Sequence, residues 1–379
     1  GCLSENRETE MKLLLRSTAL AVGLGVAASA TASAETTLTI VSWGGAYTES
    51  QQKAYHQPYM EKNPDVTILN DDSAAEGLAK LRAQYESGNI SWDIVDMIAS
   101  DSITACDEGL VYQIDPDEWL APAPDGTPAS EDFFDGTLSP GGTNCFIPQI
   151  VYSTTFGYRT DMVDTAPQTI ADVFDFEKIP GKRSLQKVPL NNLEWALISD
   201  GVPGDKVYEA MDEDENIDRA FKILDTQKAN DTVWWSKGAR PPQLLADGEV
   251  VMASAYNGRL FNAIAVENQP IAMMWDWQSF DLDGWTIPRK EAKLDVIKDY
   301  IYFATDTQRL ADQAKYISYG PARKSSAPLV GKHADLGIDM KPHMPTDPNN
   351  AENVLQFDYV WWADHSAEMN ERFNAWLAQ

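Results

Sequence analysis

The sequence predicts an α/β protein of two lobes, each a mixed β-sheet flanked by helices. Strand-like and helix-like segments alternate along most of the chain, a pattern typical of layered α/β folds. Removing an N-terminal leader of 34 residues from the 379 leaves 345, which is too many for one ordinary core and about right for two lobes. An extended, β-branched run at residues 145–155 suits a strand that crosses between lobes, and we expect more than one crossing.

Residues 11–34 have the pattern of a secretory signal peptide. The segment begins with basic residues, continues with apolar and small ones, and ends at the A-x-A site Ala32-Ser33-Ala34. We therefore expect an exported protein whose mature chain starts at Glu35, with residues 1–10 as an upstream remnant. No later run is apolar over the 18 residues that a membrane span needs.

Charge and motif content narrow the function classes. The 58 acidic residues against 30 basic ones give a formal net charge of −28, which disfavours nucleic acid and anionic lipid as partners. The negative field attracts cations, although acidity also keeps an exported protein soluble. The four histidines are scattered, and no HExxH, CxxC, GxSxG or Walker A pattern occurs. We expect no metal site, no cofactor and no catalytic residues.

Cys106 and Cys145 are the only cysteines of the predicted mature chain. A pair of cysteines in an exported protein is more often a disulfide than a functional site. Two free buried thiols are the alternative, because the sequence does not give their separation. We expect a disulfide that braces one lobe away from the ligand.

The first lobe is expected to begin with a strand, a glycine turn and a helix. Residues 37–42 form the strand, and the helix runs from a Thr48 N-cap to about residue 61. The glycines of the intervening Trp43-Gly44-Gly45-Ala46-Tyr47 permit a tight turn that exposes both aromatic rings at the strand end. The next elements are a strand at 66–69, a helix at 77–87, a strand at 92–98 and a turn at 99–101.

The second lobe centres on residues 250–288. A strand at 250–255 ends at the turn Tyr256-Asn257-Gly258, a short helix follows, and a strand at 271–275 completes a β-α-β unit. Ligands gather at the carboxyl ends of such strands. The other expected elements are helices at 172–179, 192–199, 218–226, 291–304, 307–318 and 360–377, and a strand at 187–190.

Short motifs then identify a family resemblance over the whole mature chain. SWGGAY, YNGR, FDLDGWTIP, SYGPARK and LQFDY occur in order, and with them the chain resembles the polyamine-type periplasmic solute-binding proteins of ABC transporters, the spermidine/putrescine-binding family. The resemblance implies the two-lobed periplasmic binding protein fold, with a small amine-bearing solute held in the interlobe cleft. It also implies a periplasmic monomer that hands its ligand to an inner-membrane ABC permease.

The resemblance assigns ligand contacts as well. Asp283 matches the amine-binding aspartate, and Trp43 and Tyr256 match cleft aromatics. An ammonium group favours a carboxylate together with aromatic faces, each cation–π contact contributing about 0.5–2 kcal/mol. The full set of expected ligand-binding residues is Trp43, Tyr47, Ser100, Asn191, Tyr256, Arg259, Trp275, Asp283, Tyr319 and Gln356.

Two positions depart from the polyamine pattern. Asn191 stands where the family carries a glutamate for the far amine, and Arg259 stands where it has a small residue. A guanidinium near the start of a helix favours a carboxylate over a second ammonium. A polyamine such as putrescine or spermidine is therefore the family expectation, and an ω-amino acid such as γ-aminobutyrate is the alternative. Arg259 could instead point to solvent or pair with a nearby acid.

Two other classes fit parts of the sequence less well. Carboxylates among tryptophans also describe a glycosidase, whose two carboxyl groups lie a defined distance apart. Ferric-ion binding usually takes clustered tyrosines, and Tyr316 and Tyr319 are near one another without being adjacent. We expect lobe 1 to comprise residues 35–148 and 284–322, and lobe 2 to comprise 149–283 and 323–379.

Overall fold

The computed structural model describes residues 35–379. The predicted upstream remnant and signal peptide lie outside the described residues. A single sheet organises the fold, with strand order β2-β1-β3-β8-β4-β7-β5-β6, while β10 pairs with β8 and β9 with β4. The strands are β1 (Thr36–Val41), β2 (Val66–Asp71), β3 (Ile94–Ile98), β4 (Ile147–Arg159), β5 (Arg183–Gln186), β6 (Val233–Trp235), β7 (Met252–Tyr256), β8 (Ile271–Thr286), β9 (Gly320–Pro321) and β10 (Val354–Gln356).

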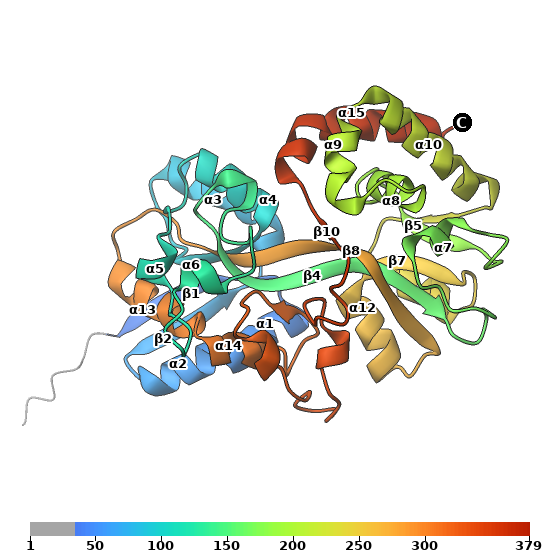
Figure 1. The fold of residues 1–379 in the computed structure, drawn as a ribbon. Coiled ribbons are helices and arrows are strands. Elements are labelled where there is room, and N and C mark those ends of the chain that lie inside the picture. The colour runs from blue at the N-terminus through green and yellow to red at the C-terminus, as the bar shows by residue number, and fades with distance from the viewer. Residues whose placement is uncertain (1–34) are drawn as a thin grey trace, which may run out of the picture. The chain divides into compact units, whose positions relative to one another are not determined.

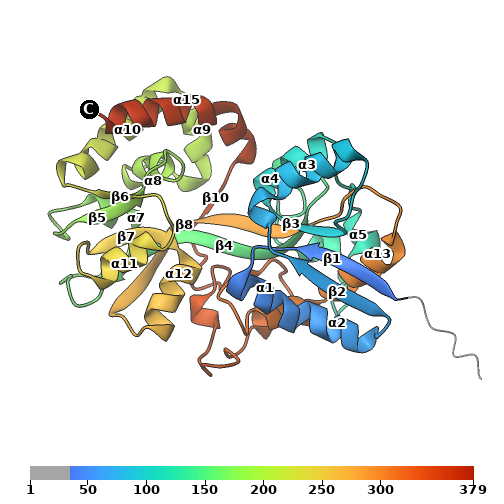
Figure 2. The ribbon, with the colours of Figure 1, turned by 180° about the vertical axis from the view of Figure 1, so that it is seen from behind.

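Helices flank the sheet in each half of residues 35–379. In the second half α8, α9, α10 and α15 lie on one side of the strands and α11 and α12 on the other (Figures 1 and 2). The helices are α1 (Gly45–Gln51), α2 (Gln57–Lys62), α3 (Gly77–Ser87), α4 (Ala99–Asp107), α5 (Pro116–Trp119), α6 (Ala129–Asp132), α7 (Ile170–Phe174), α8 (Asn192–Ser199), α9 (Val207–Met211), α10 (Asp214–Ala229), α11 (Arg240–Ala246), α12 (Asn257–Phe261), α13 (Leu294–Ala304), α14 (Thr307–Gln313) and α15 (Tyr359–Leu377). The predicted mixed α/β architecture is confirmed.

Strands β4 and β8 connect the two halves. They are the longest strands, they pair antiparallel from Ile147↔Trp285 to Arg159↔Ile271, and they run through both groups of helices in Figure 1. The β4–β8 register shifts twice, once between Thr154 and Phe156. Such irregularities bend a strand and increase its twist. The two lobes therefore share one continuous pair of strands, with a bend between them.

Each half has its own apolar core. Trp285 and Ile297 belong to the first core, which packs β1, β3, α2 and α13 together. Trp195, Phe373 and Trp376 belong to the second, which packs α8, α10 and α15. The predicted packing face of the last helix is confirmed, because its tryptophans, Met369 and Phe373 are all buried. None of the helices in residues 35–379 is long and apolar enough to cross a membrane.

Some expected local structures are wrong. Thr48 lies inside α1 and is not its N-cap; its hydroxyl accepts a hydrogen bond from the Gly44 amide at 2.9 Å and donates to Asp72. The reason is that Gly44 has φ 85°, so the glycine turn leads directly into the helix. Residues 99–101 form the first turn of α4, not an open turn. The strand expected at 271–275 continues to Thr286 as β8.

A disulfide joins Cys106 at the end of α4 to Cys145 just before β4. Cys145 is buried in a core cluster with Leu81 and Trp92 of the first lobe. The two cysteines are 39 residues apart in sequence. Closing a loop of that length removes conformational entropy from the unfolded chain, by about 3–4 kcal/mol in the chain-entropy model.

We predict that changing both cysteines to serine lowers the free energy of unfolding by about 3–4 kcal/mol. Urea unfolding of the oxidised wild type and of the double variant measures the difference. Ligand affinity should be unchanged, since the bond braces a part of the first lobe away from the candidate site. An unfolding free energy equal to that of the wild type would contradict the prediction.

Candidate functional site

Asp283 of β8 is the centre of a polar cluster at the sheet. The Trp43 indole donates to its Oδ1 at 3.0 Å, and the Tyr47 hydroxyl donates to its Oδ2 at 2.5 Å. Trp43 lies in the glycine turn after β1 and keeps 36% of its surface exposed, whereas Asp283 is 3% exposed. Direct hydrogen bonds thus join Asp283 to two residues that follow the end of β1 and lie far from it in the sequence.

A second carboxyl group lies behind Asp283. Asp96 of β3 is fully buried, and the pairing of β3 with β8 places it on the same face of the sheet as Asp283. Gln51 and Gln149 donate amide hydrogen bonds to the Asp96 carboxyl. The Tyr47 hydroxyl also lies 3.0 Å from the Gln149 side-chain oxygen, which links the two carboxyl groups into one network. The network holds the Asp283 side chain in position.

The environment opposes ionisation of both acids at once. Burial raises the pKa of Asp283 well above its ordinary value, and the neighbouring Asp96 raises it further, while its donors Tyr47 and Trp43 oppose the shift. Burial also raises the pKa of Asp96 to about 7, against the effect of Gln51. A bound cation would stabilise the ionised form of Asp283.

Tyrosine rings extend from Asp283 toward the second lobe. The Tyr319 ring lies 6.0 Å from that of Tyr47, and Tyr152 of β4 lies 6.4 Å from both Tyr319 and Tyr256. Glycine at position 258 lets the Tyr319 ring pack against the start of α12, since a Cβ atom there would lie 3.1 Å from the Tyr319 hydroxyl. The rings form an aromatic wall made of segments from both lobes.

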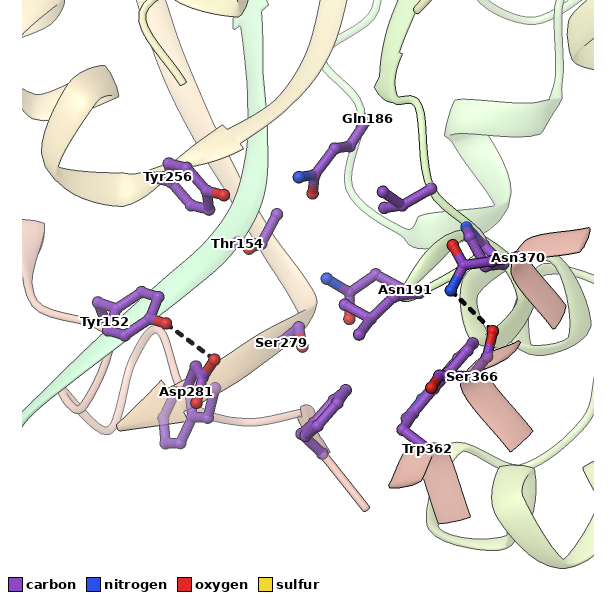
Figure 3. A pocket seen from close by; sticks show the side chains of 15 residues that line it. Tyr152, Thr154, Gln186, Asn191, Tyr256, Ser279, Asp281, Trp362, Ser366 and Asn370 are labelled. Atoms are coloured by element: carbon purple, nitrogen blue, oxygen red, sulfur yellow. Dashed lines mark hydrogen bonds between the residues drawn. The ribbon is translucent and has the colours of Figure 1, made fainter. Parts of the chain in front are cut away.

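Beyond the wall lies a cavity of about 270 Å³ (Figure 3). Tyr152, Tyr256 and Asp281 stand on one side of it, and Asn191 extends into it from the start of α8. Asn191 is 4% exposed, its side-chain oxygen has no hydrogen-bond partner in the described structure, and its backbone has φ 69°. That conformation is strained for a residue other than glycine and is held here by the surrounding fold.

Asp281 is a carboxyl group that accepts three hydrogen bonds from the protein. Its oxygens accept from the Tyr152 hydroxyl at 2.8 Å, the Tyr359 hydroxyl at 2.7 Å and the Leu282 amide at 2.8 Å. Burial raises its pKa, and the Tyr359 hydrogen bond opposes that shift. Asp281 therefore fixes two tyrosines at the edge of the cavity.

Arg259 lies on α12, beside Tyr319. Burial raises the pKa of Tyr319, the positive charge of Arg259 lowers it, and the negative charge of Asp283 raises it. Both charges thus act on one tyrosine hydroxyl. The Arg259 side chain is exposed, and it forms no salt bridge with any residue of 35–379.

Three expected contacts are not brought into this site by the structure. Ser100 is exposed in the first turn of α4, and Trp275 is half-buried on β8 with no contact to the Asp283 cluster among the described hydrogen bonds and ring pairs. Gln356 lines a different cavity of about 460 Å³ with Phe280 and Tyr359. The structure brings together Trp43, Tyr47, Tyr256, Asp283 and Tyr319, with Asn191 and Arg259 next to them.

The sequence interpretation missed several polar residues of the site. Asp96 stands in an otherwise apolar buried strand, where a carboxylate is rare unless it has a partner, so a signal was present. Tyr152 and Thr154 are two residues apart on β4 and so share one face of the strand, within the polar run Tyr152–Thr155. Gln51 and Gln149 carry no such signal, because a single glutamine has no specific chemistry.

Comparisons with known proteins bear on the class of this site. The γ-aminobutyric acid-binding protein of Pseudomonas aeruginosa is 34% identical over 343 residues, which are 90% of this chain and 91% of that protein. The solved structure of the Atu4243-GABA receptor is 30% identical, with a TM-score of 0.68, over 89% of this chain and 97% of that one. MotA of A. tumefaciens B6, solved with glucopine, is 27% identical, with a TM-score of 0.67, over 89% and 99%.

These structures confirm the two-lobed periplasmic binding protein fold that the sequence predicts. The family model described as bacterial extracellular solute-binding protein matches residues 54–346. Proteins of this family bind a small solute for an ABC importer and are not enzymes, which excludes the glycosidase interpretation. The chain therefore belongs to the bacterial extracellular solute-binding proteins.

Proposed function

We propose that the protein binds γ-aminobutyrate or a closely related ω-amino acid in the periplasm and delivers it to an ABC permease. The observation that carries the proposal is the position of Tyr319, whose ring lies 6.0 Å from that of Tyr47, the donor to Asp283, and against Gly258, the residue before Arg259. A short ligand with an ammonium at one end and a carboxylate at the other would lie along this tyrosine. The γ-aminobutyrate named for two relatives supports the same ligand class.

The ammonium end of the ligand would lie on Asp283. Its carboxylate is held by Trp43 and Tyr47, and each of its oxygens keeps acceptor capacity beyond the one hydrogen bond. The partly exposed Trp43 and the Tyr47 and Tyr319 rings supply aromatic surface for cation–π contact. We therefore assign Asp283 as the amine-binding residue of the cleft.

The carboxylate end would lie on Arg259. An arginine without a salt-bridge partner in residues 35–379 keeps its planar fork available for a bidentate contact. Putrescine would instead place a second ammonium beside this positive charge. The neutral Asn191, at the position where the polyamine binders carry a glutamate, also removes one attraction for a second amine.

A polyamine ligand is the second candidate, and Asp281 is the observation in its favour. This carboxylate lines the cavity beyond the tyrosine wall, where the far amine of an extended diamine could reach. Its hydrogen bonds to Tyr152 and Tyr359 reduce what it can offer a cation. We therefore rank the ω-amino acid above the diamine.

Titration calorimetry on wild type and Arg259→Ala distinguishes the two ligands. Loss of a charge-assisted contact should weaken γ-aminobutyrate binding by at least about tenfold, or about 1.4 kcal/mol, while putrescine binding stays the same or improves. Arg240→Ala is the matched control, since this arginine is exposed at the start of α11 and has no part in the site. Unchanged γ-aminobutyrate affinity in Arg259→Ala, or tight putrescine binding by the wild type, would contradict the proposal.

The lobe boundaries remain part of the proposal. We place residues 35–148 and 284–322 in lobe 1, and 149–283 and 323–379 in lobe 2, with β4 and β8 as shared crossings. The ligand would then contact Trp43 and Tyr47 from lobe 1 and Tyr256 and Arg259 from lobe 2. Binding both lobes at once would stabilise a closed arrangement.

A further inference from the structure

Asp96 and Asp283 form a buried pair of carboxyl groups on neighbouring strands. β3 and β8 pair antiparallel with Asp96 opposite Trp285 and Ile98 opposite Asp283, so the two acids lie on the same face, one pairing step apart. Asp96 is 0% exposed and Asp283 is 3% exposed, and Gln149, which donates to Asp96, is in turn in contact with Tyr47, the donor to Asp283. A proton on either carboxyl group would let the two acids form a direct hydrogen bond.

The other partners of the pair are neutral. Gln51 and Gln149 donate hydrogen bonds to Asp96. Trp43 and Tyr47 donate to Asp283. Within residues 35–379 no lysine, arginine or histidine forms a salt bridge with either acid. Asp93, also on the segment that leads into β3 and also 0% exposed, is different. Its carboxylate lies 2.6 Å from the Lys290 ammonium and 3.3 Å from that of Lys293.

Two like charges that are buried side by side without a cation are costly, so one proton is retained between them. We propose that ligand-free Asp96 and Asp283 share one proton, and that capture of an ammonium group at Asp283 releases this proton to solvent. The inference rests on the proposed function, because it takes Asp283 as the amine-binding residue. In the bound state the ligand supplies the positive charge that the proton supplied before, and both carboxyl groups are ionised. Asp96 thus acts as a positioning residue that sets the charge of the site.

The tyrosines and the histidine around the pair do not supply another proton in the neutral range. The tyrosines affected by the charges of the pair are Tyr47, Tyr55, Tyr152, Tyr300 and Tyr319, and burial raises the pKa of each. His56, which is hydrogen-bonded to Tyr300, has its pKa lowered to about 3 by burial and stays neutral. The nearby charged groups are Asp281, Arg259, Asp312 and Arg309.

The proposal fixes the direction of the pH dependence. The complex holds one proton fewer than the free protein, so raising the pH favours binding. The effect begins above the ordinary aspartate pKa of about 4 and extends up to the raised pKa of the pair, which is about 7 for Asp96 and well above its ordinary value for Asp283. Within that range affinity should rise by up to about tenfold per pH unit. The amine of γ-aminobutyrate resembles that of lysine, with a pKa of about 10, and stays charged throughout.

The test uses titration calorimetry with γ-aminobutyrate at several pH values, in pairs of buffers that differ in ionisation heat. The wild type should release close to one proton per ligand and show the pH-dependent affinity, whereas Asp96→Asn should release fewer protons and show a shallower profile, because Asp283 then keeps only the part of its pKa shift that burial causes. Glu194→Gln is the matched control: Glu194 is fully buried with a pKa raised to about 7 by burial, but it bonds to Tyr208 and Trp362 and is outside the pair. Its profile should follow that of the wild type. A wild type that binds with no proton release would overturn the proposal.

A second measurement needs no ligand. Carboxyl ¹³C resonances of aspartate-labelled, ligand-free protein should include one that titrates near neutral pH in the wild type and is lost in Asp96→Asn. Identical titration curves in both proteins would contradict the shared proton even if γ-aminobutyrate binds. If γ-aminobutyrate fails to bind while the neutral-range titration is present, the proposed ligand is wrong and the proton-sharing pair stands.

Discussion

Replacing Asp283 with asparagine is expected to weaken γ-aminobutyrate binding by at least about a hundredfold. The change removes the one negative charge that the ligand ammonium would contact, at a position that is 3% exposed and therefore poorly screened by water. Truncating one partner of a buried, hydrogen-bonded charge pair costs about 2–5 kcal/mol, and a hundredfold corresponds to about 2.8 kcal/mol. Titration calorimetry at neutral pH measures the loss.

The matched control is Asp276→Asn on the same strand. Asp276 accepts hydrogen bonds from the Ile170 amide and the Asn353 side chain, and lies outside the Asp283 cluster. Its affinity for γ-aminobutyrate should stay within about threefold of that of the wild type. Equal affinities in Asp283→Asn and the wild type would show that the amine is held elsewhere.

The largest expected effect on stability comes from Asp132→Ala. Asp132 accepts a hydrogen bond from Arg323 Nε at 2.5 Å and from the Ser325 hydroxyl, and Arg323 is fully buried. Removing the carboxylate leaves an arginine charge buried without its partner, which costs about 3–5 kcal/mol. Urea unfolding should therefore show a midpoint far below that of the wild type.

Asp135→Ala provides the comparison for this change. Asp135 pairs with Lys324 at 3.2 Å, but its side chain is 97% exposed. Exposed ion pairs contribute about 0–1 kcal/mol, so its unfolding midpoint should stay close to that of the wild type. Similar losses of unfolding free energy in Asp132→Ala and Asp135→Ala would contradict the account, because the stabilisation by the Arg323–Asp132 ion pair would then not depend on its burial.

Much of the fold follows from local patterns. Helix α8 has the bounds that the sequence predicts, because its apolar residues and the turn before it agree. Strand β8 was expected to end near Trp275, since polar and acidic residues follow there. The strand continues because Asp276, Asp281 and Asp283 each find donors in other parts of the fold. Partners supplied by distant segments are not visible in a local pattern.

Some residues of the candidate site could be predicted from the sequence, and others depend on contacts between distant segments. Trp43 and Asp283 could be expected from their motifs, and the structure joins them by a hydrogen bond. Gln356 lies in a motif of the family, yet its side chain is exposed and lies by Phe280. The reason is that β10 pairs with residues 278–280 of β8, before Asp283. Asp96 could not be placed behind Asp283 without the register of β3 against β8.

The most direct test of the proposed ligand geometry is a crystal structure of the protein with γ-aminobutyrate. We predict that the ammonium nitrogen lies within about 3 Å of an Asp283 oxygen and that the carboxylate contacts the Arg259 guanidinium, with Tyr319 alongside. A ligand bound in the reverse orientation, or with its amine on Asp281 in the cavity beside Asn191, would contradict the account.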